Sequence, residues 1–235
     1  IEDPFYRLNE RDVQWIDKTD WEYKTSFFVD AAILNKEVAE LEFDGLDTYA
    51  EVSVNGNVVL KADNMFRTWK ADVKKYLKEG DNELHILLRS PINEGIKKYD
   101  AQGFEIPVSD NDLAAIGQVE GNKKVSVYTR KAGYHFGWDW GPRLVTSGIW
   151  RPVTLKAWDR AKIENLQIVQ NTVTDEKATL TAVFEVNGLT EGTAHLAVLN
   201  YGKMLSNKKI ELKKGVEKYS IDFEILNPQL WWTNG

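Results

Sequence analysis

The residues best suited to chemistry lie together in one short segment, Gly137 to Pro142, which we call the tryptophan loop. Trp138 and Trp140 flank Asp139 in it. A pyranose presents C–H groups on one face and hydroxyls around its rim, so an aromatic platform beside an acceptor-only carboxylate suits both. In an extended loop the two indoles would point to one side and the carboxylate to the other. Asp139, Trp138 and Trp140 are therefore candidate substrate-binding residues for a sugar.

A purely structural interpretation of this loop fits the same residues. The indoles could close the end of a hydrophobic core, and Asp139 could pair with Arg143 or cap a turn. The glycines and Pro142 are compatible with either interpretation, because they indicate only a tight change of chain direction. Residue chemistry alone leaves both interpretations open.

Other kinds of site have little support in the sequence. His135 is the one histidine near the loop, and a lone histidine between two aromatic residues is typical of a hydrogen-bonded structural group. His85 and His195 fall in strand patterns without metal-ligand spacing. No phosphate-binding loop or nucleophile motif is present, and the 36 acidic residues nominate no pair of catalytic carboxylates. We therefore predict no catalytic residue, no metal and no cofactor.

Charge and composition limit the partners. The formal net charge is −6 and the pI is near 5.3, which argues against nucleic acid, because that binding depends on Lys and Arg contacts to phosphates. No run of 18 apolar residues occurs, so no membrane-spanning helix is expected.

The compartment is not fixed by the sequence. There are no cysteines and thus no disulfide framework. The chain begins at Ile1 without a basic and apolar leader, and it holds no Asn-x-Ser/Thr acceptor. These features fit a bacterial protein of the periplasm or the medium, whose signal peptide is removed or left out.

The elements that must position the loop are strands. Alternating apolar residues at Trp21 to Val29, at Ala39 to Phe43 and at Leu84 to Leu88 predict half-buried strands. Asn55-Gly56 predicts a tight hairpin, because both positions tolerate positive φ. A capped helical turn is predicted from Asp72 to Leu77.

The region before the loop is less regular. Alternation disappears between Pro91 and Lys124, where segments 93–102 and 111–118 suit short helices, and such an excursion usually serves a site or a domain contact. Residues 125–128 and 149–157 are predicted to be further strands. Residues 1–160 thus form one predicted β-sandwich domain.

A second domain is predicted for residues 161–235. Alternation restarts at Leu180 to Val186, Ala194 to Val198 and Tyr219 to Ile225. An immunoglobulin-like domain needs about 100 residues and seven strands. The remaining 75 residues (235 minus 160) are fewer, so we expect the last strand beyond Gly235. The predicted fold class is all-β.

At the tryptophan loop the sequence strongly resembles the β-mannosidases of glycoside hydrolase family 2. The resemblance is carried by RKAGYHFGWDWGPRL (130–144) and TSGIWRPVTL (146–155). The segments 3–27, LEFDGLDTYAEVSVNG (41–56), NMFRTW (64–69) and NPQLWWTNG (227–235) are similar to other parts of the same family's N-terminal region, so the resemblance covers essentially the whole chain.

This resemblance implies a jelly-roll-like, galactose-binding-like sandwich followed by a smaller immunoglobulin-like sandwich lacking its last strand. It also implies a separate (β/α)₈ barrel with two catalytic glutamates and a retaining mechanism. In the family, the aspartate of this loop reaches into the barrel's active site and contacts the terminal mannose. That role falls on Asp139, with Trp138 shaping the pocket and Trp140 less firmly assigned.

Three hypotheses follow for function. The chain is a non-catalytic N-terminal fragment of an exo-acting β-mannosidase that cleaves terminal non-reducing β-D-mannose, inactive alone and packed on the missing barrel. Alternatively it is a free-standing carbohydrate-binding module, or a structural spacer of a different family 2 glycosidase. The partner under the first hypothesis is a mannose-terminated β-linked oligosaccharide.

Overall fold

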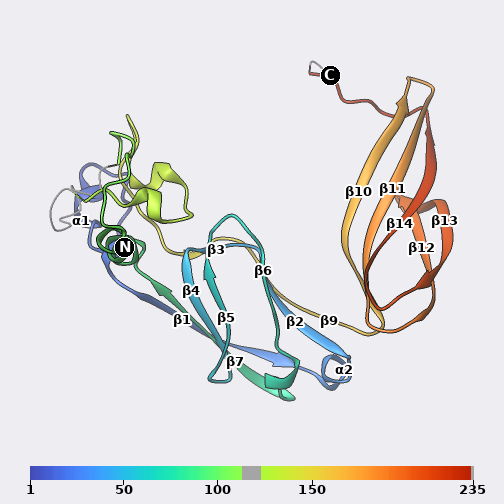
Figure 1. The fold of residues 1–235 in the computed structure, drawn as a ribbon, viewed down its shortest axis with the longest axis horizontal. Helices are drawn as coiled ribbons and strands as arrows, with labels where there is room; N and C mark the ends of the chain where they lie inside the picture. The colour runs from blue at the N-terminus through green and yellow to red at the C-terminus, as the bar shows by residue number, and fades with distance from the viewer. Residues whose placement is uncertain (113–122, 234–235) are drawn as a thin grey trace. The chain divides into compact units, whose positions relative to one another are not determined.

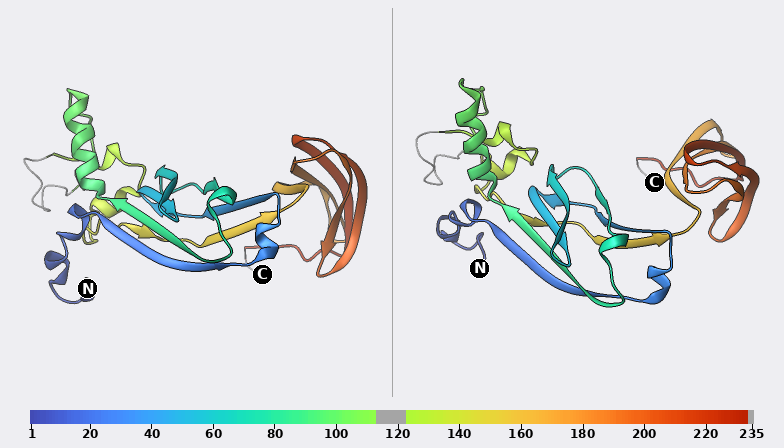
Figure 2. Two further views of the ribbon diagram at one scale, coloured as in Figure 1. Left: turned by 90° about the horizontal axis from the view of Figure 1, so that it is seen from below. Right: turned by 60° about the horizontal axis from the view of Figure 1, so that its bottom comes forward.

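The structure is a computed structural model that describes residues 1–112 and 123–233 (Figure 1). It divides into two compact units, Ile1–Ala157 and Trp158–Gly235, whereas the sequence placed the boundary at residue 160. Most of the predicted helix at 111–118 lies outside the described residues. Strands dominate both units, as the all-β prediction requires (Figure 2).

The first unit contains a four-stranded antiparallel sheet with the strand order β1-β7-β4-β5. Its strands are β1 (Trp21–Val29), β4 (Tyr49–Val54), β5 (Asn57–Asp63) and β7 (Gly80–Arg89). The predicted Asn55-Gly56 hairpin joins β4 to β5. Both of its residues have positive φ, 48° and 78°, which confirms the sequence prediction.

A second sheet faces the first across a shared core. It contains β6 (Trp69–Asp72), β2 (Val38–Phe43) and β9 (Val153–Trp158) in that order, and β3 (Leu46–Asp47) pairs separately with β8 (Gly148–Ile149). Every second residue of β2 is buried, as predicted. The core draws on both sheets and includes Leu41, Phe43, Val52, Val54, Ile86 and Leu88.

Short helices occupy the ends of this unit: α1 (Asn9–Asp12), η1 (Ile16–Lys18), α2 (Ala31–Leu34), η2 (Lys74–Tyr76) and α3 (Pro91–Gln102). The predicted turn at η2 and helix at α3 are confirmed. The helix α3 begins where Ser90 accepts a hydrogen bond from the Asn93 N–H and ends at Gly103, whose φ is 76°. No helix in the described ranges is long and apolar enough to cross a bilayer.

The prediction of a strand at residues 125–128 is wrong. Ser126–Tyr128 form a 3-10 helix, η4, because Val125 and Tyr128 pack three residues apart while Val127 is exposed. Alternation of Val125 and Val127 resembled a strand, but only the first of them is buried. A further 3-10 helix, η5 (Gly133–Phe136), follows.

These segments form a small separate core that carries the tryptophan loop. Its buried members are Ile92 of α3, Val125, Phe136 and Val145. At Gly95 the helix α3 approaches so closely that a Cβ atom would lie 2.8 Å from the Val125 Cβ. The loop therefore starts from a packed base.

The second unit has two antiparallel sheets. One has the order β10-β11-β14, and the other pairs β12 with β13. The strands are β10 (Ala161–Val173), β11 (Lys177–Gly188), β12 (Gly192–Asn200), β13 (Lys203–Leu212) and β14 (Gly215–Leu226). Their core contains the predicted alternating residues of β11 and β14, including Leu180, Phe184, Ile221 and Phe223.

One side of β10 is uncovered. Leu166 lies opposite Phe184, and Ile168 lies opposite Ala182. Directly opposed residues share a face of the sheet, and both partners belong to the buried core. Leu166 and Ile168 are nevertheless 51% and 46% exposed. The core-facing side of this edge strand therefore has no covering layer among the described residues.

Candidate functional site

The tryptophan loop leaves the small core directly after η5. Phe136 is fully buried, and Gly137 then adopts φ 137° and ψ 152°, a conformation that essentially only glycine adopts. The chain returns to the packed interior at Arg143 and Val145, which are both buried. The residues between Phe136 and Arg143 project outward.

The three predicted site residues lie together on this projection. Trp138 is 47% exposed and Trp140 is 83% exposed. Their rings meet edge to face, with centroids 5.9 Å apart and an interplanar angle of 81°, so both indoles lie on the same side of the loop. Asp139 is exposed and forms no hydrogen bond or ion pair with the described residues.

Both parts of the structural interpretation are wrong for this chain. The indoles are too exposed to close a core. Arg143 does not pair with Asp139, because its buried guanidinium forms an ion pair with Asp17 and donates to the Gln14 Oε1 at 2.7 Å. The Asp139 carboxylate is therefore available to a ligand.

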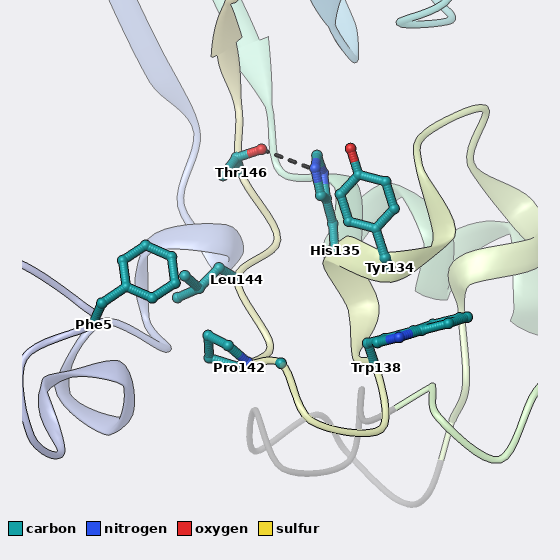
Figure 3. A pocket seen from close by; sticks show the side chains of 8 residues that line it. Phe5, Tyr134, His135, Trp138, Pro142, Leu144 and Thr146 are labelled. Atoms are coloured by element: carbon teal, nitrogen blue, oxygen red, sulfur yellow. Dashed lines mark hydrogen bonds between the residues drawn. The ribbon is translucent and has the colours of Figure 1, made fainter. Parts of the chain in front are cut away.

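A pocket of about 520 Å³ adjoins Trp138 (Figure 3). Figure 3 shows Phe5, Leu144 and Pro142 on one side and Tyr134 and Trp138 on the other, with Thr146 and His135 at one end. Its walls come from the N-terminal segment, from η5 and from both sides of the loop. The lining residues are Phe5, Tyr134, His135, Trp138, Gly141, Pro142, Leu144 and Thr146.

The polar end of the pocket rests on a buried ion pair. Lys131 pairs with Asp47 and also donates to the Thr146 Oγ1 at 3.2 Å. The Thr146 hydroxyl donates to the Asp47 Oδ2 at 3.0 Å and lies 3.4 Å from the His135 Nδ1. Because the hydroxyl proton goes to Asp47, we assign the Nδ1 proton to His135. Its Nε2 is then a hydrogen-bond acceptor.

The same surroundings favour neutral His135. Burial is the largest cause that lowers the pKa of His135 below its ordinary value of 6.5, the positive charge of Lys131 adds to it, and Asp47 opposes it. Burial likewise lowers the pKa of Lys131, against the attraction of Asp47. The pocket therefore offers aromatic rings and, in the neutral form of His135, an acceptor at the Nε2.

The lining of the pocket contains no carboxylate. None of the eight lining residues is Asp or Glu, whereas glycoside hydrolysis uses two carboxylates across the scissile bond. Within residues 1–112 and 123–233, no group of three or more His, Asp or Glu side chains is placed to hold a metal ion.

Sequence reasoning missed part of the pocket. Phe5 and Thr146 were not singled out, and Tyr134 appeared only as a neighbour of His135. The signal available was the concentration of aromatic residues around position 135. Phe5 could not be found this way, since it reaches the pocket from the opposite end of the unit's sequence.

A comparison of the sequence with models of known protein families identifies the family of this chain. The family model described as "Glycosyl hydrolase 2 galactose-binding domain-like" matches residues 1–151. The chain belongs to the glycosyl hydrolase 2 galactose-binding domain-like family. The family-2 resemblance drawn from the tryptophan loop is thereby confirmed, and the matched residues include the whole loop.

Two curated fungal relatives share the name of a β-mannosidase. "Beta-mannosidase B" of Aspergillus clavatus is 33% identical over 244 residues, and that of Emericella nidulans is 34% identical over 240 residues. Both alignments cover 100% of this family 2 chain and 27% of the relative. The chain thus spans about a quarter of the length of the curated relatives it matches.

Solved structures agree on the fold of this family 2 chain. A β-D-mannosidase from Dictyoglomus thermophilum matches with a TM-score of 0.78 and 32% identity, over 100% of this chain and 28% of the other. An exo-chitosanase from Amycolatopsis orientalis matches with a TM-score of 0.67 over 98% of this chain and 24% of the other, and at 20% identity it supports the fold alone. The galactose-binding-like sandwich followed by an immunoglobulin-like unit is confirmed.

Proposed function

We propose that this chain is a non-catalytic part of an exo-acting, retaining β-mannosidase and that its tryptophan loop contributes to the binding of a terminal β-D-mannose. The observation that carries the proposal is the exposed, unpaired carboxylate of Asp139 between two exposed indoles. Trp138 supplies an apolar surface and Asp139 accepts hydrogen bonds from sugar hydroxyls.

Family membership supports this assignment. The relatives that match the chain from end to end are named β-mannosidases and are about four times as long. Residues that perform hydrolysis are then supplied by a part outside this chain. We propose a (β/α)₈ barrel with two catalytic glutamates for that part, and we expect these 235 residues alone to be inactive.

The surroundings of the pocket support a partner domain. Phe5, Tyr134 and Trp138 are exposed and line one hollow. Contiguous exposed apolar surface of this kind marks an interaction site. We propose that the catalytic barrel covers it and completes the sugar site, so that Asp139 faces the substrate from one side.

Replacing the carboxylate tests the role of the loop. In the longer protein that the proposal implies, Asp139→Ala removes a charged acceptor, which costs about 1 to 3 kcal/mol of transition-state binding. The kcat/KM for an aryl β-mannoside should fall about 5-fold to 150-fold. Asp175→Ala, at an exposed turn of the second unit, is the matched control. An unchanged kcat/KM in Asp139→Ala would instead favour the structural spacer.

A second function is favoured by one observation, since the pocket is formed by residues of this chain alone. A free-standing carbohydrate-binding module would use it unaided. Calorimetric titration of the chain with mannose and manno-oligosaccharides separates the two functions. Saturable heat that Trp138→Ala abolishes would establish the module. The proposed function predicts no measurable binding, together with no turnover of an aryl β-mannoside by the chain.

A further inference from the structure

Arg143, the first residue after the tryptophan loop, is an unusual residue to bury. It is 4% exposed, and its ion-pair partner Asp17 is 3% exposed. Removing a guanidinium from water is costly unless its partners are close and well oriented. Its Nε and Nη2 nevertheless have no hydrogen-bond partner in the part of the chain that the structure describes. This side chain is therefore retained at a cost to the fold.

Gln14 joins Arg143 to the N-terminal segment twice. The Arg143 Nη1 donates to the Gln14 Oε1 at 2.7 Å, and the Gln14 Nε2 donates to the Arg143 carbonyl oxygen at 2.7 Å. The backbone and the side chain of Arg143 are thus fixed by the same residue. Pro142 and Leu144, its two neighbours, line the pocket beside Trp138 (Figure 3).

The N-terminal segment is itself anchored to the main sandwich. The carbonyl oxygen of Asp17 accepts from the Ser90 Oγ at 2.6 Å, and Asp20 accepts from the Ser90 N–H at 2.7 Å. Ser90 lies between β7 and α3 and caps that helix. The indole of Trp21 donates to the Ile16 carbonyl at 2.9 Å. A continuous set of bonds therefore runs from β7 to the end of the tryptophan loop.

The charge of Arg143 affects the protonation of its ion-pair partner Asp17. Burial raises the pKa of Asp17 above its ordinary value, while the charge of Arg143 opposes that shift. The charge of Arg143, followed by that of Lys18, favours the ionised form of Asp17, and Gln14 holds the same arginine, so we treat Asp17, Arg143 and Gln14 as one unit.

We propose that Arg143, held by Gln14 and Asp17, is a positioning residue that fixes the tryptophan loop in the conformation where the two indoles meet edge to face. Phe136 holds the loop at its start, and the Arg143 unit holds it at its end. The consequence for sugar binding rests on the proposed function, whereas the consequence for loop geometry does not.

The geometry can be tested on the 235-residue chain by circular dichroism. Two indoles in contact couple and give an exciton couplet, and the couplet that belongs to this pair is the one lost in Trp140→Phe. Gln14→Leu and Arg143→Met should both remove it. Lys61→Met, which breaks a surface ion pair with Glu51 in the same unit, is the control and should leave it intact.

Folding is measured in parallel by urea denaturation. A couplet that persists at full strength in folded Arg143→Met and Gln14→Leu overturns the proposal. Should Arg143→Met fail to fold, Gln14→Leu decides, because it keeps the ion pair and removes the two bonds to Arg143 together with one bond from the Gln14 Nε2 to the Glu10 carbonyl oxygen. A couplet lost in Gln14→Leu with a cooperative urea transition supports a positioning role rather than a general folding role.

The consequence for sugar binding is measured separately in the longer protein. Gln14→Leu should lower kcat/KM for an aryl β-mannoside roughly 10-fold to 100-fold, the cost of a binding group displaced by about 1 Å. Loss of the couplet without loss of kcat/KM would count against the proposed function and leave the positioning role intact. Loss of kcat/KM with an intact couplet would overturn the positioning role.

Discussion

Replacing Phe136 tests whether the tryptophan loop depends on the small core beneath it. Phe136 and Tyr134 belong to the same 3-10 helix, yet the first is fully buried and the second is 60% exposed. Phe136→Ala empties a site packed by Ile92, Val125 and Val145, which costs about 3 to 5 kcal/mol of unfolding free energy. Tyr134→Ala removes a side chain that is less than half buried, so it should lower the unfolding free energy by only about 1 kcal/mol.

Urea denaturation followed by tryptophan fluorescence measures both variants. Six of the nine tryptophans, at positions 15, 21, 69, 138, 140 and 150, lie in the first unit, so the signal reports mainly on that unit. The Phe136 variant should have a lower urea midpoint than the Tyr134 variant, with similar slopes. Equal midpoints would show that the small core opens independently of the sandwich, and the reasoning would fail.

Two further predictions concern charge and backbone conformation. Because the pKa of His135 lies below 6.5 in the folded chain, the unfolded chain binds this proton more readily, and stability should fall as pH drops from 6.5 through the lowered pKa. The difference in urea midpoints between the parent chain and His135→Gln, measured from pH 7.5 to 5, isolates this contribution, and a pH-independent difference would contradict it. Gly56→Ala, at φ 78°, should cost about 1 to 2 kcal/mol. Gly133→Ala, which meets no atom within 4 Å and has no positive φ, should change the urea midpoint little, and equal losses at the two glycines would refute the conformational argument.

Local rules predicted much of the fold from the sequence. Asn55-Gly56 specified its hairpin because two adjacent residues at positive φ leave few alternatives. Alternation specified β2, β11 and β14, since each buries one face. The aromatic and acidic residues of the tryptophan loop were also singled out from the sequence, but their exposure was left open, because the glycines and Pro142 fit both interpretations.

The contacts that build the site could not be predicted in this way. Gln14 and Arg143 are 129 residues apart, and no local pattern relates them. The sequence suggested an ion pair between Arg143 and Asp139 because the two residues are close in the chain. In the structure the buried Arg143 instead forms an ion pair with the buried Asp17. The apolar residues from Val125 to Tyr128 fit the spacing of a strand and also that of a helical turn. In the structure Val125 and Tyr128 pack with Ile92 of α3, and the segment forms a helical turn.

The uncovered side of β10 has a consequence for the behaviour of the isolated chain. Among residues 1–112 and 123–233, its apolar residues lie on a strand with no neighbour on one edge, and such an edge is a template for pairing with another chain. Two molecules that join through β10 would hide both the backbone groups and the apolar side chains at once. Purified preparations of these 235 residues should therefore become more associated as their concentration rises.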